Sequence, residues 1–121
     1  MKVLVCGGRK YNNRERLFQM LDEIHAETPI GLIIHGDATG ADTLAGEWAN
    51  ERNVSFLTYP IEPGEDGFAR NTRMLHASDP DIVMYFPGGN GTSDMVAKAY
   101  RDGRYEMIPG LAGREKQETL L

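Results

Sequence analysis

The sequence predicts an α/β fold, a three-layer sandwich in which a mostly parallel sheet of about five strands carries helices on both faces. The first observation is that short apolar runs alternate strictly with helical patterns, an order that right-handed crossovers convert into a parallel sheet. The second is that glycine-rich turns directly follow three of the apolar runs, at residues 7–9, 36–42 and 87–92. Such turns lie at the carboxyl edge of an open sheet, where these folds bind ligands.

The strands are predicted from short apolar runs that end at turn residues, which is typical of strands buried on both faces of a parallel sheet. The first two runs are separated by one long helical pattern, and each later run is again preceded by one. The predicted strands are residues 3–6, 32–34, 54–59, 82–86 and 105–108.

Four helices are predicted from apolar spacing and from capping residues. The first begins at Asn12 or Asn13 and ends before Thr28, and the second begins at Gly40 or Ala41 and runs to Arg52. The third follows a loop rich in Pro and Gly and covers residues 68–77. The fourth is expected to be capped by Thr92 or Ser93 and to run to residue 102, where Gly103 ends it.

Length and charge limit the function classes. A chain of 121 residues is expected to form one domain, here residues 1–109, followed by a polar C-terminal tail at 110–121. With 13 Lys and Arg against 18 Asp and Glu, the formal net charge is −5, which makes nucleic acid an unlikely partner because nucleic-acid binding needs many phosphate contacts. An anionic ligand must therefore be held by a local cluster of donors.

Neither a leader nor a membrane span is visible in the sequence, so we expect a cytoplasmic protein without membrane contact. Cys6 is the only cysteine and is expected to be a small buried side chain. His25, His35 and His76 lack the spacing of metal ligands, and only His35, beside a glycine turn, stands out. We expect no metal site and no cofactor.

The turn at residues 87–92 is the strongest local signal. Three glycines in four positions exceed what an ordinary turn needs, so close approach of a ligand or of another backbone segment is the economical explanation. Peptide N–H groups at a helix N-terminus bind phosphate well, and the Thr92 hydroxyl either donates to a phosphate or caps the helix. The predicted ligand-binding residues are Gly88, Gly89, Asn90, Gly91 and Thr92.

The other two glycine turns add donors at the same edge. Asp42 either holds a ribose hydroxyl or complements the helix dipole, and Asp37 is equally a turn residue or a ligand contact. The predicted ligand-binding residues in these turns are Gly7, Gly8, Arg9, Gly36, Asp37, Thr39, Gly40 and Asp42.

Cations at the start of the third predicted helix oppose its dipole, which points to an anionic partner. Arg70 and Arg73 are placed there with Asn71 between them, and we expect Arg70 and Asn71 to contact the ligand. A guanidinium suits phosphate better than an ammonium does, so Arg9 is a third candidate. Solvated surface arginines are the alternative, more for Arg73 than for Arg70 or Arg9.

Together, the segments 7–11, 35–45, 70–75 and 87–92 resemble the SLOG superfamily, a Rossmann-like group. It includes the Lonely Guy phosphoribohydrolases, the DNA-processing Smf (DprA) proteins and the molybdenum-cofactor carrier proteins. Within it the chain is most similar to the YspA, cpYpsA-related branch of bacteria and phages. The resemblance covers residues 1–109 and implies a pocket for a nucleotide or nucleotide-derived ligand, such as an ADP-ribose-like or signalling molecule, at the glycine turns.

Catalysis does not follow from the resemblance. Lonely Guy enzymes carry a glutamate after the Pro-Gly-Gly-x-Gly-Thr turn and an arginine upstream; Arg70 matches the arginine, but Met95 occupies the glutamate position. A thioether cannot transfer a proton. If the chain is an enzyme, the catalytic residues are Arg70 with Asp94, or with Asp42.

Three hypotheses about the function therefore remain open. The first is a small binding protein for a nucleotide-like small molecule, the second a nucleoside 5′-monophosphate phosphoribohydrolase, and the third a DNA- or protein-interaction module. A homodimer or higher homo-oligomer is expected, because apolar helix faces exceed what one sheet needs to cover and because relatives pair through helices.

Overall fold

The computed structural model of the protein describes residues 1–110 and contains nine elements in strict alternation. They are β1 (Lys2–Cys6), α1 (Arg14–Glu27), β2 (Leu32–His35), α2 (Ala41–Glu51), β3 (Ser55–Thr58), α3 (Gly67–Ser78), β4 (Ile82–Tyr85), α4 (Asn90–Asp102) and β5 (Glu106–Pro109).

All strands are parallel, in the order β3-β2-β1-β4-β5. The chain winds outward from β1 to β3, then returns to the other side of β1 and continues through β4 to β5. Val3 in the central strand lies opposite both Ile33 and Ile82. The winding direction thus reverses between β1 and β4, and ligands of open α/β sheets bind in the crevice that such a reversal leaves at the carboxyl ends.

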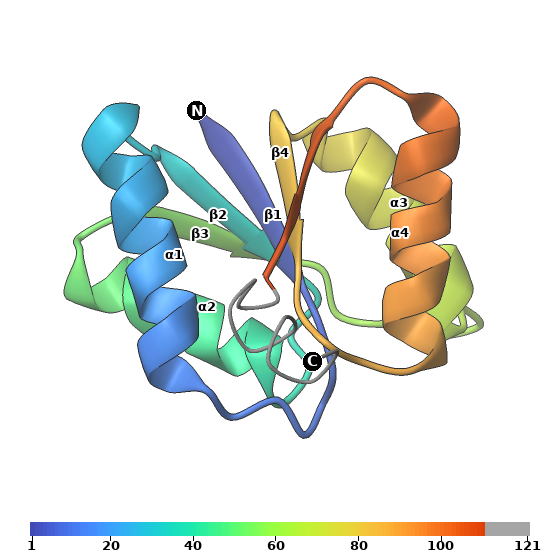
Figure 1. The fold of residues 1–121 in the computed structure, drawn as a ribbon. Helices are drawn as coiled ribbons and strands as arrows, with labels where there is room; N and C mark the ends of the chain where they lie inside the picture. The colour runs from blue at the N-terminus through green and yellow to red at the C-terminus, as the bar shows by residue number, and fades with distance from the viewer. Residues whose placement is uncertain (111–121) are drawn as a thin grey trace, which may run out of the picture.

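The core has two layers because successive residues of a buried strand face opposite sides of the sheet. Val3 and Val5 pack with residues of α1 and α2, including the fully buried Trp48. Leu4 and Cys6 pack on the other face with residues of α3 and α4. Figure 1 shows the two helix pairs on opposite sides of the sheet.

The predicted fold class is confirmed, with a sheet that is entirely parallel. Asn13 is the N-cap of α1, as expected, and its side chain accepts a hydrogen bond from the N–H of Arg16. The other boundaries differ by one or two residues except at α4. The packed chain extends through Gly110, whose N–H donates to the carbonyl of Tyr85, and the rest of the predicted tail lies outside the described residues.

The predicted start of α4 is wrong. The helix begins at Asn90, and Gly89 rather than Thr92 or Ser93 is its N-cap residue. The carbonyl of Gly89 already accepts a hydrogen bond from the N–H of Ser93, so the helix forms without help from a hydroxyl side chain. Gly91 and Thr92 consequently belong to the first helical turn.

Candidate functional site

A cleft of about 530 Å³ lies where the glycine turns after β1 and β4 approach the beginnings of α3 and α4. The cleft lies at the carboxyl edge of the sheet, where the winding direction of the chain reverses between β1 and β4. Residues from every predicted motif line it: Cys6, Gly7, Gly8, Arg9, Ala38, Asp42, Asp66, Gly67, Phe68, Arg70, Asn71, Met74, Gly89, Asn90, Gly91 and Thr92.

The structure brings most of the predicted ligand-binding residues together in this cleft. The ten that line it are Gly7, Gly8, Arg9, Asp42, Arg70, Asn71, Gly89, Asn90, Gly91 and Thr92. Gly36, Asp37, Thr39, Gly40 and Gly88 do not line it. Gly40 and Gly88 lie against the backbone of Gly8, and the Thr39 hydroxyl donates to the carbonyl of Arg9.

The wall of the cleft is built from glycine backbones in contact. The N–H of Gly8 donates to the carbonyl of Pro87 at 2.8 Å, which joins the turn after β1 to the turn after β4. A Cβ on Gly88 would lie 2.6 Å from the nitrogen of Gly8, and one on Gly40 would lie 2.1 Å from the oxygen of Gly8. These glycines are therefore required by backbone packing, one of the two explanations that the sequence left open.

Gly89 and Gly91 differ from the other glycines of the site. A Cβ on either would meet no atom within 4 Å, and both residues line the cleft. Packing within the described chain therefore does not require glycine at these two positions. The absence of side chains keeps the beginning of α4 accessible.

The beginning of α4 carries backbone donors that no side chain caps. In contrast, α1 and α3 are capped by the side chains of Asn13 and Asp66. The first N–H groups of a helix have no partner within it, and the helix dipole concentrates positive potential there. Thr92 also lines the cleft and does not cap the helix, so its hydroxyl adds a donor for an anion in that place.

Two guanidinium groups face the same cleft. Arg70 is held by the carbonyls of Gly36 and Tyr59, which accept from its Nη1, whereas its Nη2 has no partner within residues 1–110. The side chain of Arg9 likewise makes no hydrogen bond or ion pair with the described chain. The positive charges of Arg70, which is held in place, and of Arg9, which is exposed, favour an anionic ligand.

Arg73 does not belong to the site. Its guanidinium forms a two-pronged ion pair with Glu65, at 2.9 Å for both nitrogens, and it donates to the carbonyl of Pro60. The hydrogen bonds from Arg73 lower the pKa of Glu65 to about 2. The position of Arg73 in the sequence suggested an anionic partner, and that partner is Glu65 of the same chain.

Asp42 closes the turn that precedes α2. Its Oδ2 accepts from the N–H groups of Gly36 and Ala38, at 3.1 Å each, and the side chain is buried at the edge of the cleft. Burial raises the pKa of Asp42 to about 6, although the two backbone hydrogen bonds and the charge of Arg70 act in the opposite direction. The carboxyl therefore fixes the turn and remains titratable near neutral pH.

We expect this raised pKa to appear in the stability of the protein. The folded state holds the Asp42 proton more tightly than an unfolded chain does, so the stabilisation is fully present below pH 3.8 and is lost as the pH rises through about 6. Asp42→Asn removes that dependence. Between pH 4 and 7 the wild type should lose about 2 kcal/mol relative to the variant, as measured by urea unfolding; parallel profiles would contradict the assignment.

Asp94 lies outside the cleft lining. Its Oδ2 accepts from Lys98 Nζ at 2.8 Å and from Asn71 Nδ2 at 3.1 Å, an arrangement that ties α3 to α4. Met95 is buried in the core together with Ala99, so the position of the hydrolase glutamate points away from the cleft.

His35 is a structural residue. Its Nδ1 accepts from the N–H of Asp37 at 3.0 Å, and its ring stacks on Phe56. The Nε2 lies against Gly46 of α2 and has no hydrogen-bond partner within residues 1–110. Burial lowers the pKa of His35, which keeps the ring neutral.

Six lining residues were not among the predicted ligand contacts: Cys6, Ala38, Asp66, Gly67, Phe68 and Met74. Cys6 and Met74 are buried, as apolar periodicity predicts, and burial raises the pKa of the Cys6 thiol. Their position beneath a cleft follows from tertiary packing. One sequence signal could have identified part of this lining. Gly67, Arg70, Asn71 and Met74 have helical spacing, which places them on the same face of α3.

Two sequence comparisons identify relatives of this chain. The YspA, cpYpsA-related SLOG family matches residues 1–62, which contain two of the three glycine turns. The Gene 61 protein of Mycobacterium phage D29 is 33% identical over an alignment of 115 residues, with 84% of this chain and 90% of that protein covered. The chain belongs to the SLOG family.

Solved structures share the SLOG fold at lower identity. The X-ray structure of TM1055 matches with a TM-score of 0.70 and 19% identity, covering 85% of this chain and 70% of that one. DNA processing protein A (DprA) from Streptococcus pneumoniae matches with a TM-score of 0.51 and 17% identity, covering 88% of this chain and 58% of that one. The chain thus spans less than two thirds of DprA. Both structural similarities concern the fold alone.

Within residues 1–110, no helix has the length and apolar character needed to cross a membrane. In the same part of the chain, no three His, Cys, Asp or Glu side chains are grouped so that they could hold a metal ion.

Proposed function

We propose that this SLOG protein binds a nucleotide or nucleotide-derived small molecule and places its phosphate at the beginning of α4. The observation that carries the proposal is the uncapped first turn of α4, which opens onto the cleft beside two glycines whose Cβ positions are empty. Backbone N–H groups in that arrangement suit a phosphate. Arg9 and Arg70 add positive charge at the same edge.

Binding without hydrolysis is supported by the placement of the acidic residues. The hydrolase glutamate is replaced by the buried Met95, and Asp94 is held by Lys98 and Asn71 outside the cleft. Neither group can reach a ribose bound at the glycine turns without a rearrangement of α4.

A phosphoribohydrolase is the second candidate, and Asp42 is the observation that favours it. Asp42 lines the cleft, and its pKa is raised to about 6 by burial, a value suited to a general acid near neutral pH. In this reading Asp42 protonates the leaving base, and Arg70 holds the ribose phosphate.

One experiment separates the two candidates. Small molecules released from the purified protein are identified by mass spectrometry, and the protein is then incubated with AMP while free adenine is followed by chromatography. We expect a bound nucleotide and no adenine. Adenine release that disappears in Asp42→Asn would establish the hydrolase instead, and a protein that retains no nucleotide and does not bind AMP would contradict both.

We also propose that the protein acts in the cytoplasm as a homodimer. The sequence suggested pairing through helix faces, but three of the five large apolar side chains that the described chain exposes lie in β3 and the loop after it: Phe56, Leu57 and Ile61. An edge strand with uncharged, exposed residues favours association. Light scattering at micromolar concentration measures it, and a monomeric mass would contradict the dimer.

A further inference from the structure

Phe68 is an exposed aromatic side chain in the wall of the cleft. Of the large apolar side chains that residues 1–110 expose, namely Phe56, Leu57, Ile61, Phe68 and Tyr100, only Phe68 lines the cleft. Its exposed fraction is 48%. Leaving part of a ring in water forfeits the free energy of burying it, and the described chain leaves about half of this residue uncovered.

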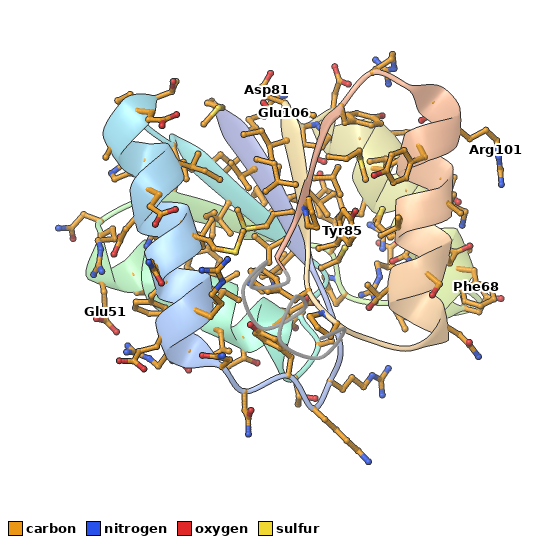
Figure 2. All side chains as sticks on the ribbon, viewed as in Figure 1. Glu51, Phe68, Asp81, Tyr85, Arg101 and Glu106 are labelled. Atoms are coloured by element: carbon orange, nitrogen blue, oxygen red, sulfur yellow. The ribbon has the colours of Figure 1, made fainter. Side chains whose placement is uncertain are left out.

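The backbone beneath Phe68 is held in place. Asp66 caps α3 by accepting from the N–H of Ala69 at 2.7 Å. The carbonyl of Phe68 accepts from Lys98 Nζ at 2.6 Å and from the Thr72 hydroxyl. Figure 2 shows Phe68 where α3 begins, near the first turn of α4. The ring is therefore presented from a fixed position at the side of the cleft.

The cleft has an apolar part and a polar part. Met74 and Cys6 supply buried sulfur-containing side chains, which pack well against aromatic groups, and Phe68 extends this apolar surface to the rim. The polar part is formed by the first turn of α4 and by the side chains of Arg9, Asp42, Arg70 and Asn71. A phosphate or sugar phosphate needs only the polar part, whereas a nucleoside phosphate uses both.

We propose that Phe68 is the base-stacking residue of the site, so that the ligand is a nucleoside phosphate whose flat base lies on the Phe68 ring. This inference rests on the proposed function, because the phosphate must occupy the beginning of α4. It adds selectivity for nucleotides over sugar phosphates. Lys98 Nζ lies over the ring at 6.0 Å from its centroid, the outer limit of a cation–π interaction, and Phe68 is still 48% exposed.

Calorimetric titration with AMP and with ribose 5-phosphate tests the inference. We expect the wild type to bind AMP more tightly, and Phe68→Ala to weaken AMP binding by about 5- to 150-fold, the range for loss of one base–aromatic stack. Ribose 5-phosphate binding should change by less than about twofold, since it has no base to stack. Phe68→Tyr should retain AMP binding. Tyr100→Ala, which removes an exposed ring from α4 that does not line the cleft, is the matched control and should change neither affinity.

The outcomes separate this inference from the proposed function. If the wild type binds both ligands and Phe68→Ala leaves the ratio of affinities unchanged, the stacking role is overturned while phosphate binding stands. If Phe68→Ala weakens both ligands equally, Phe68 only shapes the cleft and the inference is again overturned. If the wild type binds neither ligand, the proposed function and the inference fail together.

Discussion

Gly40→Ala should destabilise the protein by about 3 kcal/mol and lower its Tm by about 10 to 15 °C. Gly40 has φ +79° and ψ −125°, a conformation that L residues rarely adopt. A Cβ there would lie 2.1 Å from the oxygen of Gly8 and 2.6 Å from the carbonyl carbon of Arg9. Both contacts are with backbone, so the turn after β1 would have to move away from α2.

Gly64→Ala is the matched control for Gly40→Ala. Gly64 also has φ +79°, but a Cβ on it would meet nothing within 4 Å. The control therefore carries only the cost of the backbone conformation, about 1 kcal/mol. Urea unfolding of both variants measures the difference, and equal losses would show that the contact between Gly40 and Gly8 does not hold the site together.

The fold was predictable because its signals are local and agree with one another. Short apolar runs such as Val3–Cys6 alternate with amphipathic helices, and a capping residue such as Asn13 marks where a helix begins. The start of α4 was missed because the sequence offers Thr92 and Ser93 as caps, whereas Gly89 closes the first turn through its backbone carbonyl. Capping preferences describe helices whose first N–H groups are hydrogen-bonded by an N-cap side chain. In α4 no side chain accepts from these N–H groups.

The sequence predicted which turns form the site. It did not predict which glycines are required by backbone packing and which leave space in the cleft. In sequence, Gly88 and Gly89 are equivalent neighbours. In the structure a Cβ on Gly88 would lie 2.6 Å from the nitrogen of Gly8, whereas one on Gly89 would meet nothing within 4 Å. That difference arises from contact between the turns after β1 and β4, which are far apart in the chain. The partner of Arg73 was missed for the same reason, since only the folded loop brings Glu65 to it.

Gly89→Val should abolish most nucleotide binding and leave the fold largely intact. The isopropyl group occupies open space at the beginning of α4, where we place the phosphate. Losing two charge-assisted hydrogen bonds to a phosphate costs about 3 kcal/mol, which corresponds to about 100-fold in AMP affinity. Val is a poorer N-cap than Gly, so we expect about 1 kcal/mol of lost stability, which leaves the protein folded at the temperature of the titration.

Ala97→Val is the matched control for Gly89→Val, because it places the same isopropyl side chain at an exposed position of α4 that does not line the cleft. Calorimetry with AMP should show an unchanged affinity for Ala97→Val, and unfolding curves should show that both variants are folded. If Gly89→Val binds AMP as the wild type does, the phosphate does not lie at the beginning of α4. The empty space beside Gly89 and Gly91 would then have no bearing on ligand binding, because a side chain placed in it would displace nothing.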